Sequence, residues 1–161
     1  ILTHHENDIP RKELLCNYCC NENDIGIIAL SETHLDQNIC DSEIQFDGYS
    51  LFRRDRNRMG GGVLIFARND LHAVELNNFH VPGLESVYIK FSVNNKCMIF
   101  GVFYRPPNQD ANQVNTFLEG LHSQFLLLNS PPWSKFPKFF TGDFAWHSLA
   151  RKALKSCSPC K

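Results

Sequence analysis

One run of apolar residues, followed at once by a carboxylate, constrains the fold of this chain more than any other segment. Residues 25–30 are small or apolar and rich in isoleucine, and they lead through Ser31 into Glu32. Such a run between polar residues is typical of a strand buried on both faces, within a sheet that other layers cover. A carboxylate at the end of that strand would emerge at the rim of the sheet, where it can bind a ligand or a metal ion. From its position alone, a solvated loop glutamate is an equally good interpretation.

The remaining apolar patterns predict an α/β layered domain around this strand. Helical spacing indicates amphipathic helices over residues 11–21 and 110–128, the second capped by Asn108 or Asp110. Residues 87–93 alternate between apolar and polar, which predicts a half-exposed strand that turns at Asn94-Asn95. Further strands are expected at residues 49–52, 63–67, 98–103 and 137–141.

A basic, glycine-rich segment separates the strands expected at 49–52 and 63–67, which predicts a β-hairpin. Its guanidinium groups suit phosphate oxygens, but a solvated loop partly neutralised by Asp55 explains them equally well. Residues 60–62 are three glycines without a following Gly-Lys-Ser/Thr pattern, so they indicate a tight turn or bulge, not a phosphate-binding loop. The arginines are Arg53, Arg54, Arg56 and Arg58.

Three of the expected buried strands end in polar side chains. The first ends in Glu32, the strand 98–103 leads into Tyr104-Arg105, and the strand 137–141 leads into Asp143. If these ends meet at one rim, they form a set suited to phosphoester cleavage. A divalent metal ion on Glu32 would polarise a phosphate oxygen, Asp143 would orient or deprotonate a water molecule, and Tyr104 with the arginines would stabilise the pentavalent anion.

Composition limits the class of protein. The chain has 161 residues, 43% hydrophobic and 20% charged, with a net charge of −1, which predicts one globular domain without a bulk preference for nucleic acid. No apolar run approaches the roughly 18 residues of a membrane span, and no signal-peptide pattern opens the sequence. Most of the seven cysteines are interpreted as reduced thiols of an intracellular protein. Cys16–Cys19 and Cys157–Cys160 have zinc-ligand spacing, but they lie too far apart for a typical zinc site, which favours coincidence.

Four motifs occur in order along the chain: Ile27 to Thr33, Arg53 to Val63, Tyr104-Arg105-Pro106-Pro107 and Thr141-Gly142-Asp143-Phe144. Together they resemble the endonuclease/exonuclease/phosphatase (DNase-I-like) superfamily, and most of all the endonuclease domain of LINE-type non-LTR retrotransposons. The resemblance covers about residues 11–146 as a partial domain, with irregular ends at 1–10 and 147–161. It implies a four-layer α/β sandwich of two mixed β-sheets flanked by helices, truncated at both ends.

The resemblance also implies a function. The activity would be Mg²⁺-dependent (or Mn²⁺-dependent) hydrolysis of DNA phosphodiesters, in the nucleus, beside a reverse transcriptase domain of the full element. Glu32 would bind the metal ion, Tyr104 would contact the scissile phosphate and Asp143 would orient the attacking water. Arg53, Arg54 and Arg105 would bind the DNA backbone.

Departures from the family pattern predict weak or no activity. Ala145 stands where the resemblance implies a phosphate-contacting asparagine. We find no convincing equivalent, before Arg11, of the metal-site asparagine on the family's first strand, and the later Ser-Asp-His, which supplies the family's catalytic histidine, is missing from this sequence. Two alternatives stay open: a non-catalytic nucleic-acid-binding module that uses Arg53, Arg54, Arg56, Arg58 and Arg105, or another phosphoesterase of the same superfamily.

Overall fold

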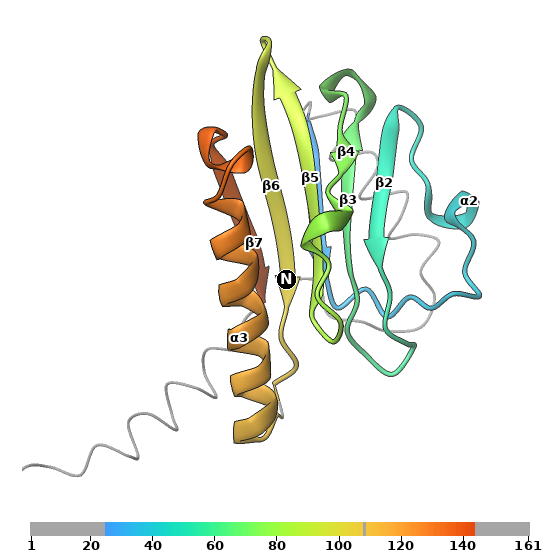
Figure 1. Ribbon diagram of the computed structural model, residues 1–161. Coiled ribbons are helices and arrows are strands. Elements are labelled where there is room, and N and C mark those ends of the chain that lie inside the picture. Colours follow the sequence, from blue (N-terminus) through green and yellow to red (C-terminus); the bar gives the residue numbers. More distant parts are fainter. Residues whose placement is uncertain (1–24, 108, 144–161) are drawn as a thin grey trace, which may run out of the picture.

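Two β-sheets packed face to face form the core of the chain, which the computed structural model describes over residues 25–107 and 109–143 (Figure 1). The first sheet is antiparallel, in the order β1-β3-β2. The second sheet has the order β4-β5-β6-β7, and only the β6–β7 pair is parallel. The strands are β1 (Ile27–Ser31), β2 (Tyr49–Arg54), β3 (Val63–Arg68), β4 (Val74–Glu75), β5 (Glu85–Val93), β6 (Lys96–Tyr104) and β7 (Lys138–Asp143).

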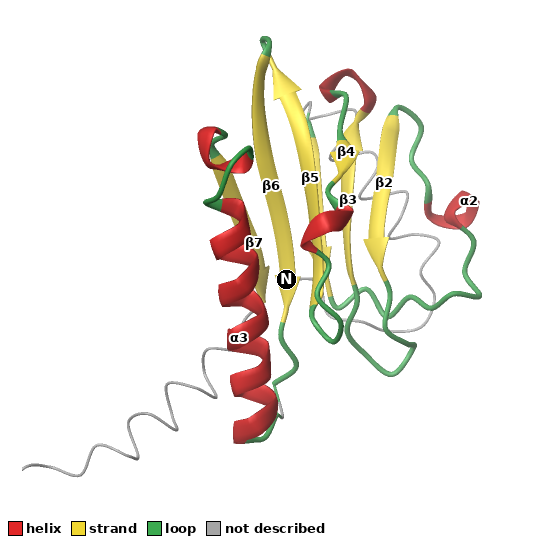
Figure 2. Ribbon diagram, viewed as in Figure 1, coloured by secondary structure: helices red, strands yellow, loops and turns green. Residues whose placement is uncertain are grey.

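Helical segments are few (Figure 2). The long helix α3 begins after Asp110, whose side chain accepts a hydrogen bond from the Gln113 backbone N–H, as a helix cap should. The helix predicted at 110–128 and its cap at Asp110 are therefore confirmed, whereas the helix expected at 11–21 lies outside the described residues. No helix in the described part of the chain combines the length and hydropathy of a membrane span. The helices are α2 (Asp41–Ile44), α3 (Ala111–Leu128) and the 3₁₀ turns Asn69–Leu71, Asn77–Phe79 and Trp133–Lys135.

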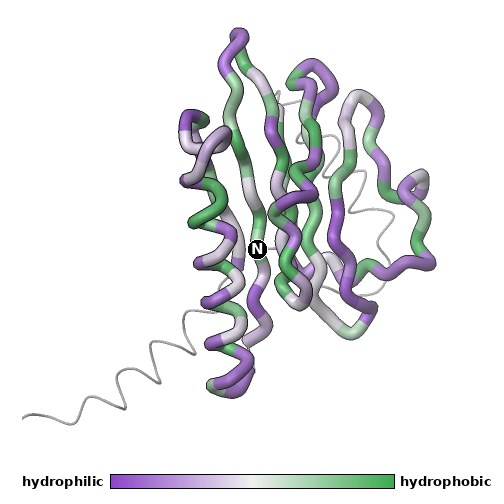
Figure 3. The backbone as a smooth tube through the Cα atoms, viewed as in Figure 1, coloured by the Kyte–Doolittle hydropathy of each residue, from purple (hydrophilic) through white to green (hydrophobic). Residues whose placement is uncertain are grey.

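Alternate residues of β3 and β5 fill the space between the two sheets. Side chains two positions apart point to the same face of a strand, so each strand contributes a row to this core. The rows are Val63, Ile65 and Ala67 from β3 and Val87, Ile89 and Phe91 from β5. Figure 3 shows apolar residues along these strands and hydrophilic residues in many of the connections.

Each sheet is also covered on its outer face. Helix α3 packs against the second sheet, where Leu128 lies with Tyr88 and Phe103 in a buried cluster (Figure 1). The first sheet is covered in the described residues by the connection that contains α2, with Phe46 packed on Phe66. The layered α/β arrangement is thus confirmed, but the first sheet is antiparallel, not mixed as expected.

Three expectations about burial are wrong. In β1 only Ile28 is buried, because β1 has a single neighbouring strand, β3, in the described residues, and β3 is the central strand of the first sheet. The supposedly exposed face of β5 is buried at Tyr88 because α3 covers it. Strand β7 lies at the end of its sheet among the described residues, so that Phe139 and Phe140 are 51% and 40% exposed.

Candidate active site

The ends of four strands, β1, β2, β6 and β7, meet at one rim of the two sheets. We call this rim the shared edge, and it lies at the lower side of Figure 1. Strands β1 and β2 both end beside Val63, the first residue of β3. Tyr104 is the last residue of β6, and it lies opposite Asp143, the last residue of β7. The residues predicted from strand ends, Glu32, Tyr104 and Asp143, therefore all lie at the shared edge.

A direct hydrogen bond joins the two sheets here. The Tyr104 hydroxyl donates to Glu32 Oε1 at 2.5 Å, across 72 residues of sequence. The backbone of Glu32 has a φ of 55°, a left-handed conformation that is uncommon for a residue with a side chain. Such conformations concentrate at functional sites, because the surrounding structure must hold them in place.

Tyr104 is the buried member of this pair, with only 3% of its surface exposed, whereas Glu32 is exposed. Burial and then the hydrogen bond to Glu32 raise the pKa of Tyr104 well above the usual value of 10.0. The phenol therefore keeps its proton and remains a hydrogen-bond donor even at pH values where a free tyrosine would ionise.

Asp143 is exposed and lies beside Tyr104 in the parallel ladder. Partner residues in neighbouring strands direct their side chains to the same face of the sheet. The backbone continues this pairing, since the Arg105 N–H donates to the Asp143 carbonyl oxygen at 2.8 Å. Two carboxylates and a protonated phenol thus occupy one end of the molecule.

The predicted DNA-binding arginines have partners within the protein. Arg53 pairs with Asp41 at 2.9 Å, and Arg54 pairs with Glu75 at 2.8 Å. Arg105 is only 1% exposed, and its Nη1 donates to the Pro106 carbonyl oxygen at 3.2 Å. Their contact with DNA stays a prediction, and each has a structural role in its own right.

Two residues at the shared edge were not assigned to the site from the sequence. The Arg56 guanidinium carbon lies 5.8 Å from the centre of the Tyr104 ring, and Arg56 Nη1 pairs with Glu85 Oε1 at 2.9 Å. Arg56 could not be singled out because four arginines fall within residues 53–58. Glu85 lies at the start of a strand, and no local pattern marks it.

The tight turn predicted here lies at Arg58 and Met59, where the Gly60 N–H donates to the Asn57 carbonyl oxygen at 3.2 Å, and the other two glycines follow it. Gly61 and Gly62 have φ values of 79° and 85°, which only glycine adopts without strain. The backbone of residues 33 and 34 bonds to them, with the His34 N–H donating to the Gly61 carbonyl oxygen at 3.0 Å. The hairpin loop therefore lies directly against the segment that carries Glu32.

The chemistry of the donors fits a hard divalent cation. Mg²⁺ prefers oxygen ligands and commonly uses one or two carboxylates together with water and substrate phosphates. Glu32 and Asp143 provide such oxygens at the shared edge. A cluster of three or more His, Cys, Asp or Glu side chains suited to a metal ion does not occur among the described residues.

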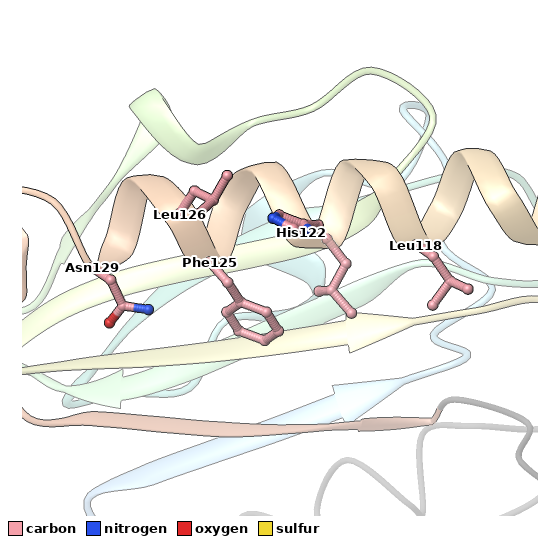
Figure 4. Close-up of a pocket in the computed structure, with 6 residues that line it drawn as sticks. Leu118, His122, Phe125, Leu126 and Asn129 are labelled. Atoms are coloured by element: carbon pink, nitrogen blue, oxygen red, sulfur yellow. The ribbon is translucent and has the colours of Figure 1, made fainter.

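Another surface feature lies away from the shared edge. A shallow depression runs along α3, and Figure 4 shows that its lining comes from that helix. It holds none of the three predicted site residues and is mostly apolar, so it does not enter the chemistry of the shared edge. Its lining residues are Leu118, Leu121, His122, Phe125, Leu126 and Asn129.

The sequence matches no family model and no curated protein. Solved structures are similar: the endonuclease domain of TRAS1, a telomere-specific non-LTR retrotransposon, has a TM-score of 0.59 at 12% identity, over 88% of this chain and 54% of that one. The catalytic domain of human Nocturnin has a TM-score of 0.59 at 13% identity, over 92% of this chain and 62% of that one. This is the DNase-I-like fold.

A third DNase-I-like structure is similar over less of its length. ANGEL2, a 2',3'-cyclic phosphatase, has a TM-score of 0.52 at 14% identity, over 88% of this chain and 45% of that one. The chain thus spans about half the length of the DNase-I-like structures that it matches, from 45% to 62%.

Proposed function

We propose that this DNase-I-like domain is a Mg²⁺-dependent (or Mn²⁺-dependent) DNA endonuclease domain of a non-LTR retrotransposon, with weak activity. The observation that carries the proposal is the hydrogen bond from Tyr104 to Glu32, which brings a protonated phenol and a carboxylate together beside Asp143. The similarity to the TRAS1 endonuclease domain supports the choice of DNA as substrate. The partners would be nuclear DNA and a reverse transcriptase domain of the same element.

Each residue has a distinct part in phosphodiester hydrolysis. Glu32 would hold the metal ion, which when bound supplies a Lewis acid for the phosphoryl oxygen. Asp143, an exposed carboxylate, orients a water molecule and accepts its proton as the water attacks. Tyr104 would keep its proton, and with Glu32 on the metal ion its single O–H would turn from Glu32 to the phosphate oxygen on which negative charge develops.

Ala145 is the reason why we expect weak nuclease activity. The family resemblance implies an asparagine at this position, and alanine has no side-chain donor for a phosphate oxygen. Loss of one oriented donor typically costs about 10²–10³ in rate.

Nicking of supercoiled plasmid tests the proposal. We expect slow conversion to the open circle in Mg²⁺, none in EDTA, and a loss of at least about 10²-fold in Glu32→Gln and in Asp143→Asn. Glu119→Gln, an exposed carboxylate on α3, serves as the matched control and should nick like the wild type. Nicking that survives Glu32→Gln would show that the site lies elsewhere.

A second candidate is a phosphoesterase that acts on smaller molecules. ANGEL2, a 2',3'-cyclic phosphatase, shares this fold with the TRAS1 endonuclease domain, so the fold does not choose between these substrate classes. Hydrolysis of bis(p-nitrophenyl) phosphate without plasmid nicking, lost in Glu32→Gln, would favour this candidate.

The ion pairs of the hairpin argue against a purely DNA-binding module. Arg53, Arg54, Arg56 and Arg58 each pair with a carboxylate of the chain, which reduces the positive charge available for phosphates. Salt-sensitive DNA binding without nicking in Mg²⁺ would reverse this conclusion.

A further inference from the structure

We propose that Arg56 and Glu85 form a positioning pair that fixes the ring of Tyr104 so that its hydroxyl meets Glu32. The inference deepens the proposed function, on which its kinetic consequence rests. The hairpin loop would align the phenol through these two side chains. Arg56 and Glu85 are positioning residues and not catalytic residues.

The first step is the attachment of the loop to the second sheet. Arg56 Nε donates to the Gly60 carbonyl oxygen at 2.7 Å, which folds the side chain back along its own loop. Glu85 then receives two hydrogen bonds from that loop, from Arg56 Nη1 at 2.9 Å and from the Gly62 N–H at 2.5 Å. One carboxylate at the start of β5 thereby holds a loop that belongs to the first sheet.

The second step is the contact with Tyr104. Glu85 and Tyr104 are direct partners in the β5–β6 ladder, so their side chains leave the same face of the sheet. With Arg56 held by Glu85, its guanidinium lies 5.8 Å from the centre of the Tyr104 ring. A cation at that distance attracts the ring face and restricts the turning of the ring.

The loop makes room for this pair. A Cβ atom on Gly61 would lie 2.5 Å from Glu85 Oε2 and 2.6 Å from Arg56 Cζ, closer than any packed atoms approach. A Cβ on Gly60 would lie 3.1 Å from Arg56 Nη2. Two of the three consecutive glycines therefore leave the space that the Arg56 and Glu85 side chains occupy. This observation does not depend on the contact between Arg56 and Tyr104.

The pair is partly shielded from solvent, so salt screens its attraction less than that of a fully exposed ion pair. The side chains of Arg56 and Glu85 are 34% and 13% exposed, and the carboxylate is the more buried. Arg54 and Glu75 form a pair of the same kind from the same hairpin, with 34% and 26% exposed, but no contact of that pair with Tyr104 is present among the described interactions. This second pair is a matched control.

Fluorine NMR of the full chain labelled with 3-fluorotyrosine reads the position of Tyr104 without any need for activity. The chain has four tyrosines, so Tyr104→Phe assigns the resonance by its disappearance. We expect Arg56→Ala and Glu85→Gln each to shift the Tyr104 resonance, the double variant to shift it little further, and Arg54→Ala to leave it in place. Arg56→Lys, which keeps the charge but only one of the two hydrogen bonds, should give a smaller shift.

Kinetics complete the test. In the nicking assay, Arg56→Ala should lower kcat by about tenfold and change KM by less than about twofold, because a displaced phenol fails mainly in the transition state. Arg68→Ala, which breaks the Arg68–Asp70 pair at the opposite end of β3, should leave kcat and KM unchanged.

The outcomes separate the two proposals. An unshifted Tyr104 resonance in Arg56→Ala overturns the positioning role, as does an equal shift in Arg54→Ala. A raised KM with unchanged kcat also overturns it, because Arg56 would then bind phosphate directly. A shifted resonance in a protein that nicks no DNA at all supports the positioning pair and refutes the endonuclease function.

Discussion

Gln124 on α3 is the buried polar residue that joins this helix to the second sheet. It is only 2% exposed and lies among apolar side chains. Its amide accepts a hydrogen bond from the Tyr88 hydroxyl and donates to the Phe79 carbonyl oxygen at 2.6 Å and to Ser86 Oγ at 3.0 Å. Substitution by leucine, similar in size, removes all three bonds while keeping the packing.

The cost of Gln124→Leu can be worked from these bonds. Each buried group left without a partner costs about 1–3 kcal/mol, and three groups lose their partner. The leucine no longer buries an amide, so part of the loss is recovered. We expect the free energy of unfolding to fall by about 2–4 kcal/mol.

Urea unfolding followed by circular dichroism measures this change. The control is Ser123→Ala, at the neighbouring exposed position, whose hydroxyl bonds only within the helix, to the Glu119 carbonyl oxygen at 2.9 Å. We expect the control to stay within about 0.5 kcal/mol of the wild type. Adding Tyr88→Phe to Gln124→Leu should cost less than Tyr88→Phe does in the wild type, because the phenol no longer has an acceptor.

Two results would refute this reasoning. A free energy of unfolding for Gln124→Leu within about 0.5 kcal/mol of the wild type would mean that the amide contributes nothing to the packing of α3. Full additivity of the Tyr88 and Gln124 substitutions would mean that their hydrogen bond is not formed.

Two further predictions concern alkaline pH and the hairpin glycines. Burial raises the pKa of Tyr88 and of Tyr104, so the folded state keeps both protons while the unfolded chain loses them above pH 10. The free energy of unfolding should fall as the pH rises above about 10, by up to about 1.4 kcal/mol per pH unit for each tyrosine. In Tyr104→Phe this fall should be less steep, because only Tyr88 still contributes to it. The same slope in Tyr104→Phe and in the wild type would contradict the raised pKa of Tyr104. Gly62→Ala should cost about 2–4 kcal/mol in urea unfolding, because φ is 85° and the new Cβ would overlap Thr33 Oγ1. Gly48→Ala, at a φ of 82° in open space, should cost only about 1–2 kcal/mol, and equal costs would refute the steric argument.

Local patterns predicted the regular elements well. The strands at 49–52, 63–67 and 98–103 and the helix from Asp110 are present close to the expected bounds. The Asn94-Asn95 turn is present too, with both residues at positive φ. These features depend on residues adjacent in sequence, through alternation, capping and turn chemistry, so the sequence contains the whole signal.

Burial was predicted less well because it depends on which other elements cover a strand. The polar face of β5 is buried because α3 lies over it, and Gln124 satisfies the Tyr88 hydroxyl there. The apolar strand β7 is exposed because it has one neighbour in the described residues. Neither fact can be read from the periodicity of the strand itself.

At the candidate site, the sequence alone determined that Glu32, Tyr104 and Asp143 follow apolar strands, since a strand that ends puts its next polar residue at a rim of its sheet. Only the tertiary structure decided that these rims coincide, because the bond between Tyr104 and Glu32 joins two sheets across 72 residues. It also decided that Arg56, one arginine among four, lies over the Tyr104 ring, held there by Glu85. Long-range contacts of this kind depend on how the sheets pack, and no local pattern encodes them.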